Sequence, residues 1–533
     1  MHESGDVGVR TADALAWSNR HLSSLLRRAA AGSPDKLAVV DGSVRLTYRE
    51  LNHLADAVTD ALAGAGIESG DVVSWQLPNW WEAVVIHHGI IGLGAISNPL
   101  LTILRERELS YMLRNSGSRL LFAPSTFRGV DHASMLSKLR AGLPDLESVV
   151  IVRPGDDEVP SFTDFINGRS APPPVVRASR ATDATLLLYT SGTEANPKGA
   201  LHSHNTLDYE IRTIVENFDL SSEDVVFMPS PLPHITGVCY GIHLPVMLQA
   251  PVVLQDVWDA KRGLDLIESE GCSFTVAATP FLRMLCEEPS LSGRDLSAFR
   301  NFACGGADVS PSLVRSASER LGLPVVRVYG STEFPTLSCG RPSDPLDRRA
   351  ETDGYLLGRA EVRCIDEEGL DLPAGCVGEL LVRGPELFLG YLDPEITARS
   401  MIDGWFSTGD LGTIEPDGAV VIRGRKKDII IRGGENISAK EVEDLLLQNP
   451  DLQEVAVVAS PDPVMVERVC AFVVARHGSS PSLPDIVAEL RRHGLMPQKL
   501  PERLVVVDEL PKTASGKIKK FELRARLKES ETA

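Results

Sequence analysis

Five short segments of this 533-residue chain carry side chains suited to chemistry on a nucleotide triphosphate. Each segment is punctuated by glycine and holds one or two groups that could bind phosphate, ribose or a metal ion. In chain order they are YTSGTEANPKG (189–199), YGSTE (329–333), STGD (407–410), GRKKD (424–428) and PKTASGK (511–517). Together they predict one site for a nucleotide triphosphate, with the last segment on a separate C-terminal piece.

The first segment offers the groups that hold a triphosphate, namely hydroxyls, glycine amides unshielded by side chains and one ammonium. A kinase-type P-loop would end in Gly-Lys-Ser or Gly-Lys-Thr, but here Lys198 precedes Gly199, which argues against that class. The segment therefore predicts phosphate binding of a different type. Its candidate binding residues are Thr190, Ser191, Gly192, Thr193 and Lys198.

The order and spacing of the five segments resemble those of the AMP-forming acyl-CoA synthetases, the carboxylate–CoA ligases of the ANL adenylate-forming superfamily. The resemblance covers nearly the whole chain, and it implies that residues 190–199 grip the β- and γ-phosphates of ATP. Many relatives, however, have Thr or Ser and then Gly where this chain has Glu194 and Ala195. A solvated carboxylate there would repel the triphosphate by up to about 1 kcal/mol, so we expect Glu194 to point to water.

The resemblance assigns further nucleotide contacts to the middle segments. It implies that Tyr329 stacks on adenine, that Thr332 contacts the α-phosphate and that Glu333 holds Mg²⁺. One carboxylate suffices for a hard cation that also bridges phosphate oxygens. Asp410 matches the aspartate that accepts both ribose hydroxyls, and Arg425 the arginine that meets ribose or phosphate. The backbone wall around adenine and the acyl group is expected at Gly305, Gly306 and Ala307.

Lys517, in the last segment, is the strongest catalytic candidate. A carboxylate that attacks the α-phosphorus of ATP adds negative charge to the phosphoryl oxygens. An ammonium brought in by a mobile domain stabilises that charge selectively in the transition state. The resemblance implies that Lys427 is the hinge of this domain, and that the loop with Gly433 and Gly434 enters the site for a thioester-forming step.

His234, in PLPHITG, lies where the family keeps an aromatic residue or a histidine beside the reacting carboxylate. Its neighbours Thr236, Gly237 and Cys239, with Ala303–Ala307, are expected to line the acyl pocket. Their small size predicts room for a bulky acyl group. This favours alicyclic, polycyclic or fatty acids as substrates, and aryl acids are not excluded.

An alternation of strands and helices must position these segments. Apolar runs at Leu37–Asp41 and Val72–Leu77 predict buried strands, and apolar residues at helical spacing predict helices over Thr47–Ala63 and Asn79–Leu93. Repeated βα units predict a mostly parallel sheet covered by helices, with ligands at the carboxyl ends of its strands. Further expected elements are strands at Ala184–Tyr189, Val225–Met228, Val252–Leu254, Phe274–Ala277, Phe302–Cys304 and Val325–Tyr329, a helix N-cap at Ser310 and a capping box at Ser438 and Glu441.

The pattern changes in the last third of the chain. Short alternating strands over 358–423 predict a small β-barrel or sheet, and a new α+β unit begins after Arg425. We therefore predict an α/β protein of two domains. The N-terminal domain (1–424) combines mostly parallel sheets, covering helices and the barrel, and binds ATP and the acyl substrate. The smaller, mobile α+β C-terminal domain (425–533) carries Lys517.

Composition narrows the class of protein. Hydrophobic residues at 43% and charged residues at 24% are ordinary globular values. The formal charge of −19 argues against a nucleic-acid or anionic-membrane partner. The eight scattered cysteines show no zinc-site spacing and favour free thiols in a reducing compartment. The most apolar stretch, Val84–Leu101, is interrupted by histidines, glycines and a proline, so it predicts a buried helix followed by a strand. We expect a cytoplasmic protein without a membrane span.

The residues and the resemblance predict a ligase that joins a carboxylic acid to ATP–Mg²⁺, releases pyrophosphate, and passes the acyl group from the adenylate to CoA. The first alternative hands the adenylate to a carrier protein or a separate partner acyltransferase. A luciferase-like oxygenase finds no support in the residues. Related enzymes are often dimers, so a homodimer stays open. A regulatory protein with a dead site is disfavoured by the intact Lys198, Glu333, Asp410, Arg425 and Lys517.

Overall fold

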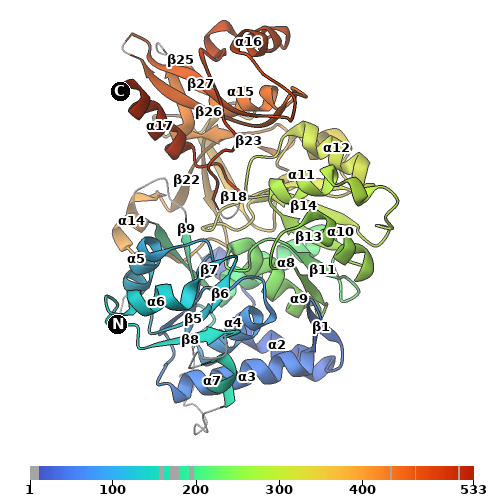
Figure 1. Ribbon diagram of the computed structural model, residues 1–533, viewed down its shortest axis with the longest axis vertical. Helices are drawn as coiled ribbons and strands as arrows, with labels where there is room; N and C mark the ends of the chain where they lie inside the picture. The colour runs from blue at the N-terminus through green and yellow to red at the C-terminus, as the bar shows by residue number, and fades with distance from the viewer. Residues whose placement is uncertain are drawn as a thin grey trace.

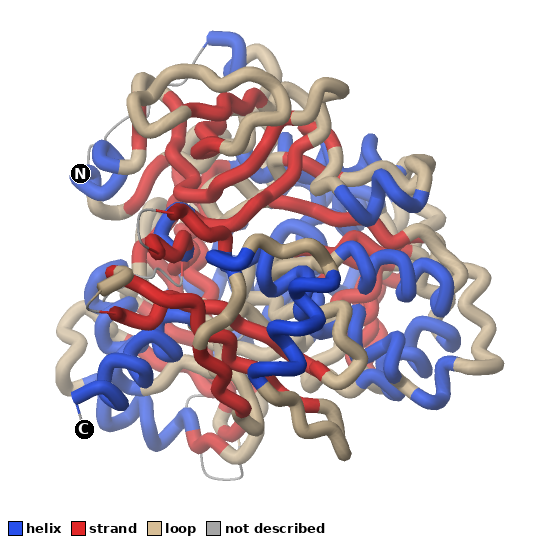
Figure 2. Tube along the Cα trace, turned by 90° about the horizontal axis from the view of Figure 1, so that it is seen from above, coloured by secondary structure: helices blue, strands red, loops and turns tan. Residues whose placement is uncertain are grey.

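The computed structural model forms a large α/β body with a smaller unit at the C-terminal end of the chain (Figure 1). In Figure 1 the C-terminal unit, coloured orange to red, lies above the body. Seen from above, strands run through the interior and helices lie mostly outside them (Figure 2). The structure describes residues 11–532 apart from 155–160, 168–178, 191–196, 433–434, 463 and 514–515.

The first large sheet of the body has nine strands in the order β17-β16-β15-β14-β13-β11-β12-β1-β2. Its inner strands from β15 to β1 run parallel, so their carboxyl ends meet at one edge of the sheet. The strands are β1 (Leu37–Asp41), β2 (Val44–Thr47), β11 (Val226–Met228), β12 (Val252–Leu254), β13 (Phe274–Ala277), β14 (Asn301–Gly305), β15 (Val325–Tyr329), β16 (Ser338–Cys339) and β17 (Tyr355–Leu356).

The second large sheet has seven strands in the order β20-β10-β9-β4-β3-β5-β8. Strands β9 and β10 pair antiparallel and bracket the first glycine-rich segment, while β4, β3, β5 and β8 are parallel. A separate hairpin joins β6 (Thr126–Phe127) to β7 (Val130–Asp131). The sheet strands are β3 (Val72–Trp75), β4 (Ile96–Pro99), β5 (Leu120–Pro124), β8 (Ser148–Val152), β9 (Ala184–Thr190), β10 (Lys198–Ser203) and β20 (Gly390–Tyr391).

Helices cover these sheets, and the largest apolar cluster lies between them, with Trp75, Ile211 and Phe274 fully buried. Helix α3 begins at a capping box in which Thr47 and Glu50 satisfy each other's backbone amides. The helices of the body are α1 (Thr11–Ala14), α2 (Ser23–Gly32), α3 (Tyr48–Gly64), α4 (Trp81–Leu93), α5 (Glu106–Ser116), α6 (His132–Arg140), α7 (Phe162–Asn167), α8 (His204–Phe218), the π-helix η1 (Gly237–His243), α9 (Leu244–Leu248), α10 (Ala260–Ser269), α11 (Thr279–Glu287), the 3₁₀ turn η2 (Pro289–Leu291), α12 (Pro311–Leu321), α13 (Leu346–Glu351) and α14 (Pro394–Arg399).

A five-stranded, mainly antiparallel sheet connects the body to the C-terminal unit, whose own sheet has the order β25-β24-β27-β26 with β28 beside β27. The connecting strands are β18 (Glu361–Ile365), β19 (Gly378–Arg383), β21 (Met401–Ile402), β22 (Trp405–Ile414) and β23 (Val420–Arg425). The C-terminal unit contains η3 (Lys426–Asp428), β24 (Ile429–Arg432), β25 (Glu435–Ser438), α15 (Ala439–Leu446), β26 (Leu452–Asp462), β27 (Val466–Ala475), α16 (Leu483–Arg492), η4 (Pro497–Lys499), β28 (Arg503–Val506) and α17 (Lys520–Thr532).

The predicted fold class is confirmed, because parallel sheets, covering helices, a small connecting sheet and a smaller C-terminal unit are all present. The predicted strands and helices occur within a few residues of their expected bounds, and Ser310 caps α12. The capping box expected at Ser438 and Glu441 forms only in part. Ser438 accepts the Glu441 amide, but the Glu441 carboxylate binds Lys499 at 2.6 Å instead of returning to the helix start.

His88 of α4 is buried, and within the described part of the chain both of its ring nitrogens lack a hydrogen-bond partner. Burial lowers the pKa of His88 from 6.5 to about 4. The unfolded chain therefore binds this proton more readily, so stability is complete above pH 6.5 and falls as the pH drops towards 4. We expect His88→Leu to raise the melting temperature at pH 7, and to remove up to about 3 kcal/mol of destabilisation at pH 4.

Melting curves between pH 4 and pH 8 test this expectation. The matched control is His53→Gln, which changes an exposed histidine of the neighbouring helix α3. The idea is wrong if His88→Leu and the wild type lose stability equally between pH 6.5 and pH 4.

Candidate active site

The loop after β15 carries Thr332 and Glu333 and is anchored from two sides. The Thr332 carbonyl oxygen accepts a hydrogen bond at 2.7 Å from Nε2 of His202, a buried residue of β10. Oε1 of Glu333 accepts a hydrogen bond at 2.6 Å from Tyr391 Oη. The hydrogen bond from Tyr391 therefore fixes the orientation of the Glu333 carboxylate. Within the described ranges, no group of three His, Cys, Asp or Glu side chains could hold a metal ion.

His202 acts on this loop as a hydrogen-bond donor. A carbonyl oxygen only accepts, so Nε2 carries the proton, and burial keeps the ring neutral by lowering the pKa of His202 to about 4. We expect His202→Leu to raise the KM for ATP about tenfold, because the Thr332 carbonyl loses its donor. His202→Gln places an amide donor at similar reach and should stay within about threefold of the wild type. Pyrophosphate release at varied ATP measures both, and equal effects of the two substitutions would contradict the anchoring role.

Asp410 lies between two other predicted nucleotide-binding residues. It is opposite Arg425 in the pairing of β22 with β23, and its Oδ1 binds Arg425 Nε at 2.9 Å. Its Oδ2 accepts a hydrogen bond from Tyr329 Oη at 2.7 Å. The Asp410 carboxylate is the main reason that the pKa of Arg425 is raised. The three side chains thus form one hydrogen-bonded group at the end of β15.

Lys517 reaches the same region from the C-terminal unit. Its loop is fixed by a hydrogen bond from Lys517 N to Thr513 Oγ1 at 3.0 Å, and by close packing in which an added side chain at Gly516 would meet Pro280 Cγ at 2.7 Å. Burial and then Arg425 lower the pKa of Lys517, while Asp410 and Glu333 oppose this effect. The structure therefore brings Lys517 close to the charged groups of three other motifs. The most distant of them in the sequence, Glu333, lies 184 residues before Lys517.

His234 faces Lys517 across a cavity. Burial, and then the Lys517 charge, lower the pKa of His234 to about 4, so its ring is neutral. The backbone amide of Thr236 donates to His234 Nδ1 at 3.4 Å. The proton therefore resides on Nε2, which can donate a hydrogen bond to a carboxylate.

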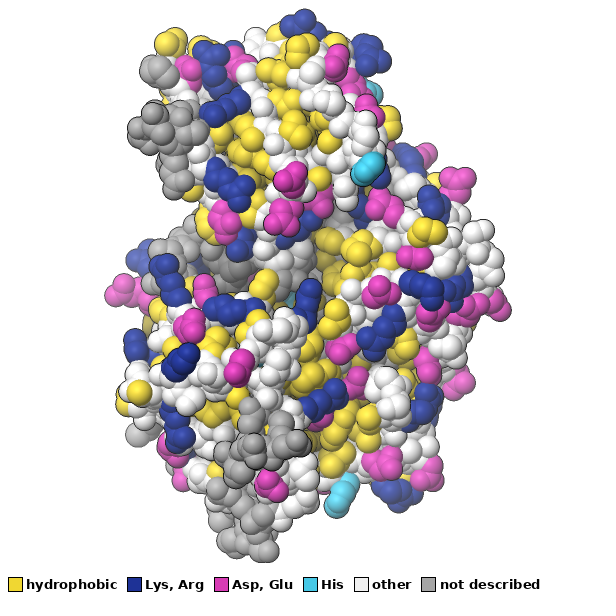
Figure 3. All heavy atoms as spheres, viewed as in Figure 1, with side chains coloured by type: hydrophobic (Ala, Val, Ile, Leu, Met, Phe, Trp, Pro, Cys, Tyr) yellow, Lys and Arg dark blue, Asp and Glu magenta, His cyan; other side chains and the backbone are white. Residues whose placement is uncertain are grey.

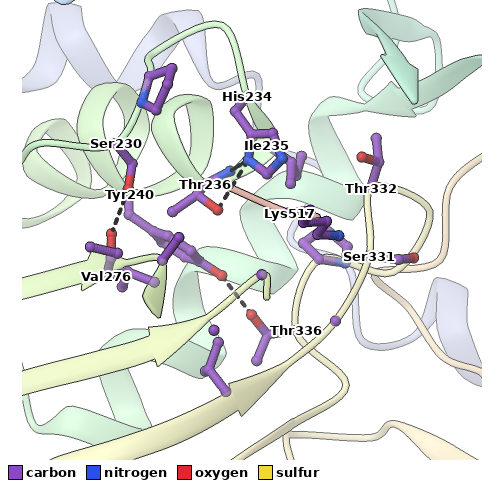
Figure 4. Close-up of a pocket in the computed structure, with 18 of the residues that line it drawn as sticks. Ser230, His234, Ile235, Thr236, Tyr240, Val276, Ser331, Thr332, Thr336 and Lys517 are labelled. Carbon is purple, nitrogen blue, oxygen red and sulfur yellow. Dashed lines mark hydrogen bonds between the residues drawn. The ribbon is translucent and has the colours of Figure 1, made fainter. Parts of the chain in front are cut away.

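The cavity has a volume of about 60 Å³ and connects the reacting groups to an apolar region. Figure 4 shows Lys517, Ser331 and Thr332 on one side of it and Tyr240 on another. The apolar walls come from the ends of the parallel strands and from α11, as expected for a ligand site on such a sheet. They are formed by Ile235, Val276, Ala277, Ala278, Phe281, Val328 and Pro335.

Only some of the small residues that predicted a roomy pocket line the cavity. Of the described residues around the cavity, Thr236 and Gly305 line it, but Gly237 and Cys239 do not. A side chain at Gly237 would meet the Pro231 carbonyl oxygen at 2.2 Å, so the glycine permits close packing of the π-helix η1 against its own entry loop. Backbone packing therefore accounts for the small size of Gly237, and the room for a bulky acyl group stays a prediction.

Of the remaining predicted residues, some lie at the site, one does not line the cavity and others lie outside the described part of the chain. Thr190 and Lys198 are opposite each other in the β9–β10 pairing, and Lys198 Nζ lies 5.8 Å from the centre of the Tyr391 ring. Gly306 lines the cavity beside Gly305, whereas Ala307 does not. Ser191, Gly192, Thr193, Glu194 and Gly434 lie outside the described residues, so their roles stay predictions.

Sequence reasoning missed five residues described above or lining the cavity: His202, Glu210, Tyr240, Thr336 and Tyr391. Tyr240 and Thr336 line the cavity. Glu210 lies outside this lining and accepts hydrogen bonds from the Tyr240 hydroxyl and the Thr336 backbone amide. One signal was available, because Glu210 lies among Leu207, Ile211 and Ile214 on the apolar side of α8, where a carboxylate needs a specific partner.

The C-terminal unit contacts the body near the site through polar groups. Lys440 of α15 forms an ion pair with Asp308, which follows the Gly305–Ala307 segment. Arg283 of α11 donates to the Gln453 carbonyl oxygen at 2.7 Å. On the face shown in Figure 3, basic and acidic side chains are interspersed over both units. No helix of the described chain is long and apolar enough to cross a membrane.

Comparisons with known proteins agree with this geometry. Family models match at residues 26–392 (AMP-binding enzyme) and 441–517 (AMP-binding enzyme C-terminal domain). A medium-chain fatty-acid–CoA ligase of Escherichia coli is 38% identical over 95% of this chain and 90% of its own length. A salicylyl-CoA synthase / salicylate adenylyltransferase of a Streptomyces species is 34% identical over 97% and 96%, respectively. The crystal structure of an anthranilate CoA ligase with anthranoyl-AMP aligns with a TM-score of 0.90 and 27% identity, covering 98% of this chain and 100% of that chain.

Proposed function

The chain belongs to the AMP-binding enzyme family and is an AMP-forming acyl-CoA ligase of the adenylate-forming superfamily, and from this premise we propose how its residues divide the reaction and which acids it activates. ATP and CoA are the co-substrates of such a ligase. The observation that carries the proposal is the cavity in which Lys517, His234 and Thr332 face an apolar pocket.

In the first half-reaction the carboxylate of the acid lies between His234 and Lys517. A carboxylate oxygen bonds to the α-phosphorus of ATP as the bond from that phosphorus to the bridging oxygen breaks, which releases pyrophosphate. The Nε2 proton of His234 orients the carboxylate, and the Lys517 ammonium stabilises the negative charge that grows on the phosphoryl oxygens. Thr332 adds a hydroxyl at the α-phosphate, and Glu333 would hold Mg²⁺, which neutralises phosphate charge when bound.

The nucleotide is held by the group around Asp410. Its carboxylate receives the ribose hydroxyls, Arg425 meets ribose or phosphate, and Tyr329 lies against adenine. The hydrogen bonds among these three side chains support this assignment, since they fix the carboxylate before the nucleotide arrives. The β- and γ-phosphates are assigned to the loop between β9 and β10.

In the second half-reaction the thiol sulfur of CoA bonds to the acyl carbon as the bond from that carbon to the AMP oxygen breaks. This releases AMP, and the thiol proton passes to solvent. We place the domain boundary after residue 424 and the hinge at Lys427, in the short η3 turn that joins the connecting sheet to the C-terminal unit. CoA is the proposed acceptor, and a carrier protein or a partner acyltransferase is the alternative. The homodimer stays a prediction.

The substrate is proposed to be a fatty or alicyclic monocarboxylic acid of moderate size. The apolar walls of the cavity suit a hydrocarbon group. The reported activity of the Escherichia coli relative, a medium-chain fatty-acid–CoA ligase, supports the same class.

Pyrophosphate release with ATP–Mg²⁺ tests the proposal across fatty, aryl, alicyclic and polycyclic acids, each with and without CoA. Pyrophosphate together with acyl-CoA from fatty or alicyclic acids is the expected result. Pyrophosphate without acyl-CoA would assign the acceptor role to another molecule. Turnover of polycyclic acids alone would overturn the proposed substrate class.

A further inference from the structure

A buried carboxyl links the acyl pocket to the nucleotide loop. Oε1 of Glu210, on α8, accepts a hydrogen bond from Tyr240 Oη at 2.5 Å, and its Oε2 accepts the backbone amide of Thr336 at 3.1 Å. Tyr240 Oη also lies 2.6 Å from Thr336 Oγ1. Glu210 and Thr336 are fully buried and Tyr240 is 3% exposed. One side chain thus holds a wall of the pocket and the loop that carries Thr332 and Glu333.

Tyr240 is fixed from its backbone as well. It belongs to the π-helix η1, a rare conformation that concentrates at functional sites. Every residue of η1 is buried, and side chains added at Gly237 or Gly241 would collide with the segment from Met228 to Leu232. The backbone of η1 is therefore closely packed behind the ring. Figure 4 shows the Tyr240 ring reaching into the cavity with its hydroxyl directed at Thr336.

We infer that Glu210 is a positioning residue and Tyr240 a specificity-determining residue, which together set the depth of the acyl pocket and tie that depth to the nucleotide loop. The inference deepens the proposed function and rests on its substrate class. Tyr240, held upright by Glu210, closes the apolar end of the cavity, so that acids with long hydrocarbon chains are rejected. The same carboxyl keeps the Thr336 amide, and hence the loop, in the position that ATP requires.

The chemistry of the side chains explains why a hydrogen-bonding group is needed at position 210. Burial raises the pKa of Glu210 to about 7, and even in its neutral form the carboxyl can accept from the Thr336 amide and bond to the tyrosine hydroxyl. A glutamine can do the same with its carbonyl oxygen and its amide group. A leucine can do neither, so it leaves the Thr336 amide without an acceptor in a buried site.

The test compares four variants of the full-length enzyme with the wild type. Tyr240→Ala removes the ring, and Tyr240→Phe removes only its hydroxyl. Glu210→Leu removes both hydrogen bonds, and Glu210→Gln restores them. The matched control is Tyr209→Phe, which also deletes a tyrosine hydroxyl from the region of α8. In the wild type this hydroxyl accepts a hydrogen bond from the Arg359 amide, away from the cavity. The readouts are kcat/KM for hexanoate, octanoate, decanoate and dodecanoate, and the Kd for ATP–Mg²⁺ by calorimetry without any acid.

We expect Tyr240→Ala to raise the ratio of kcat/KM for dodecanoate over hexanoate tenfold or more. Glu210→Leu should raise the same ratio threefold or more and increase the Kd for ATP–Mg²⁺ at least fivefold. Tyr240→Phe should raise the ratio threefold or more with little change in that Kd. Glu210→Gln and Tyr209→Phe should stay within twofold of the wild type in both readouts. A uniform loss of activity towards every acid in Tyr240→Ala and Glu210→Leu would overturn the inference.

Two further outcomes are decisive. If Glu210→Leu does not fold, Tyr240→Phe decides. An unchanged ratio of kcat/KM for dodecanoate over hexanoate in that variant would overturn the inference, and a raised ratio would support it. If the wild type activates none of these acids, the proposed substrate class fails. The Kd for ATP–Mg²⁺ then tests the link between Glu210 and the nucleotide loop by itself. An equal Kd in Glu210→Leu and Glu210→Gln would overturn the link to the nucleotide loop, and a fivefold difference would support it.

Discussion

Lys517→Ala should lower the rate of acyl-adenylate formation by a hundredfold or more while leaving ATP binding nearly unchanged. The lysine lines the cavity beside His234 and lies close enough to Asp410, Glu333 and Arg425 for their charges to affect its pKa. Its ammonium acts on charge that is present in the transition state and largely absent in the ground state, so kcat should fall far more than affinity. Acid-dependent pyrophosphate release and calorimetry with ATP–Mg²⁺ separate the two effects.

The control for this experiment is Lys519→Ala. Lys519 lies two residues further along, and its ammonium pairs with Glu522 at 2.9 Å outside the cavity. It should keep wild-type activity and the same melting temperature. Unchanged pyrophosphate release in Lys517→Ala would refute the catalytic role, whereas a lowered melting temperature in that variant alone would point to a structural one.

Asp410→Ala should raise the KM for ATP about a hundredfold. The loss of two charge-assisted hydrogen bonds to ribose costs about 3 kcal/mol, since each bond of this kind contributes roughly 1.5–3 kcal/mol. The substitution also leaves Tyr329 Oη and the Arg425 guanidinium without their acceptor. We therefore expect a lower melting temperature too, which ATP–Mg²⁺ no longer restores. Pyrophosphate release at varied ATP and melting curves with and without the nucleotide measure both effects.

Asp417→Ala serves as the matched control. Asp417 lies in the turn between β22 and β23 and forms an ion pair with Arg348, so it belongs to the same hairpin without approaching the site. Its removal should leave the KM for ATP unchanged. Equal KM values for Asp410→Ala and the wild type would remove Asp410 from the nucleotide site.

Much of the fold follows from local sequence patterns. The strands β1 and β13 and the helix α3 could be predicted because each is specified by nearby residues, by a buried apolar run or by a capping side chain such as Thr47. The same holds for the meeting of Lys517 and Thr332 in one cavity, which the order of the short motifs predicted. The place of His234 beside them was implied by the resemblance to the family. Their catalytic roles stay predictions until the variants are measured.

The depth and shape of the pocket could not be predicted in the same way. The hydrogen bond from Thr336 to Glu210 spans 126 residues, and that from Tyr240 to Glu210 spans 30. Such contacts depend on how α8, η1 and β15 pack, and no short-range pattern marks a π-helix. For this reason the small size of Gly237 predicts space from the sequence, although in the structure it permits a close approach of two backbone segments.

The C-terminal unit contacts the body through an ion pair and through close apolar packing. These two kinds of contact should respond differently to salt, and so affect the relative rates of the two half-reactions. The proposed rotation must separate Lys440 from Asp308, a pair held by charge, and Gly516 from Pro280, a contact held by shape. Dissolved salt weakens the first only through its exposed part, since the Lys440 side chain is 12% and the Asp308 side chain 38% exposed, and it leaves the second almost unchanged. Raising ionic strength should therefore shorten the time that the lysine spends over bound ATP and favour the thioester-forming arrangement. If the proposed rotation occurs, we expect the electrolyte around the enzyme to influence which half-reaction limits turnover.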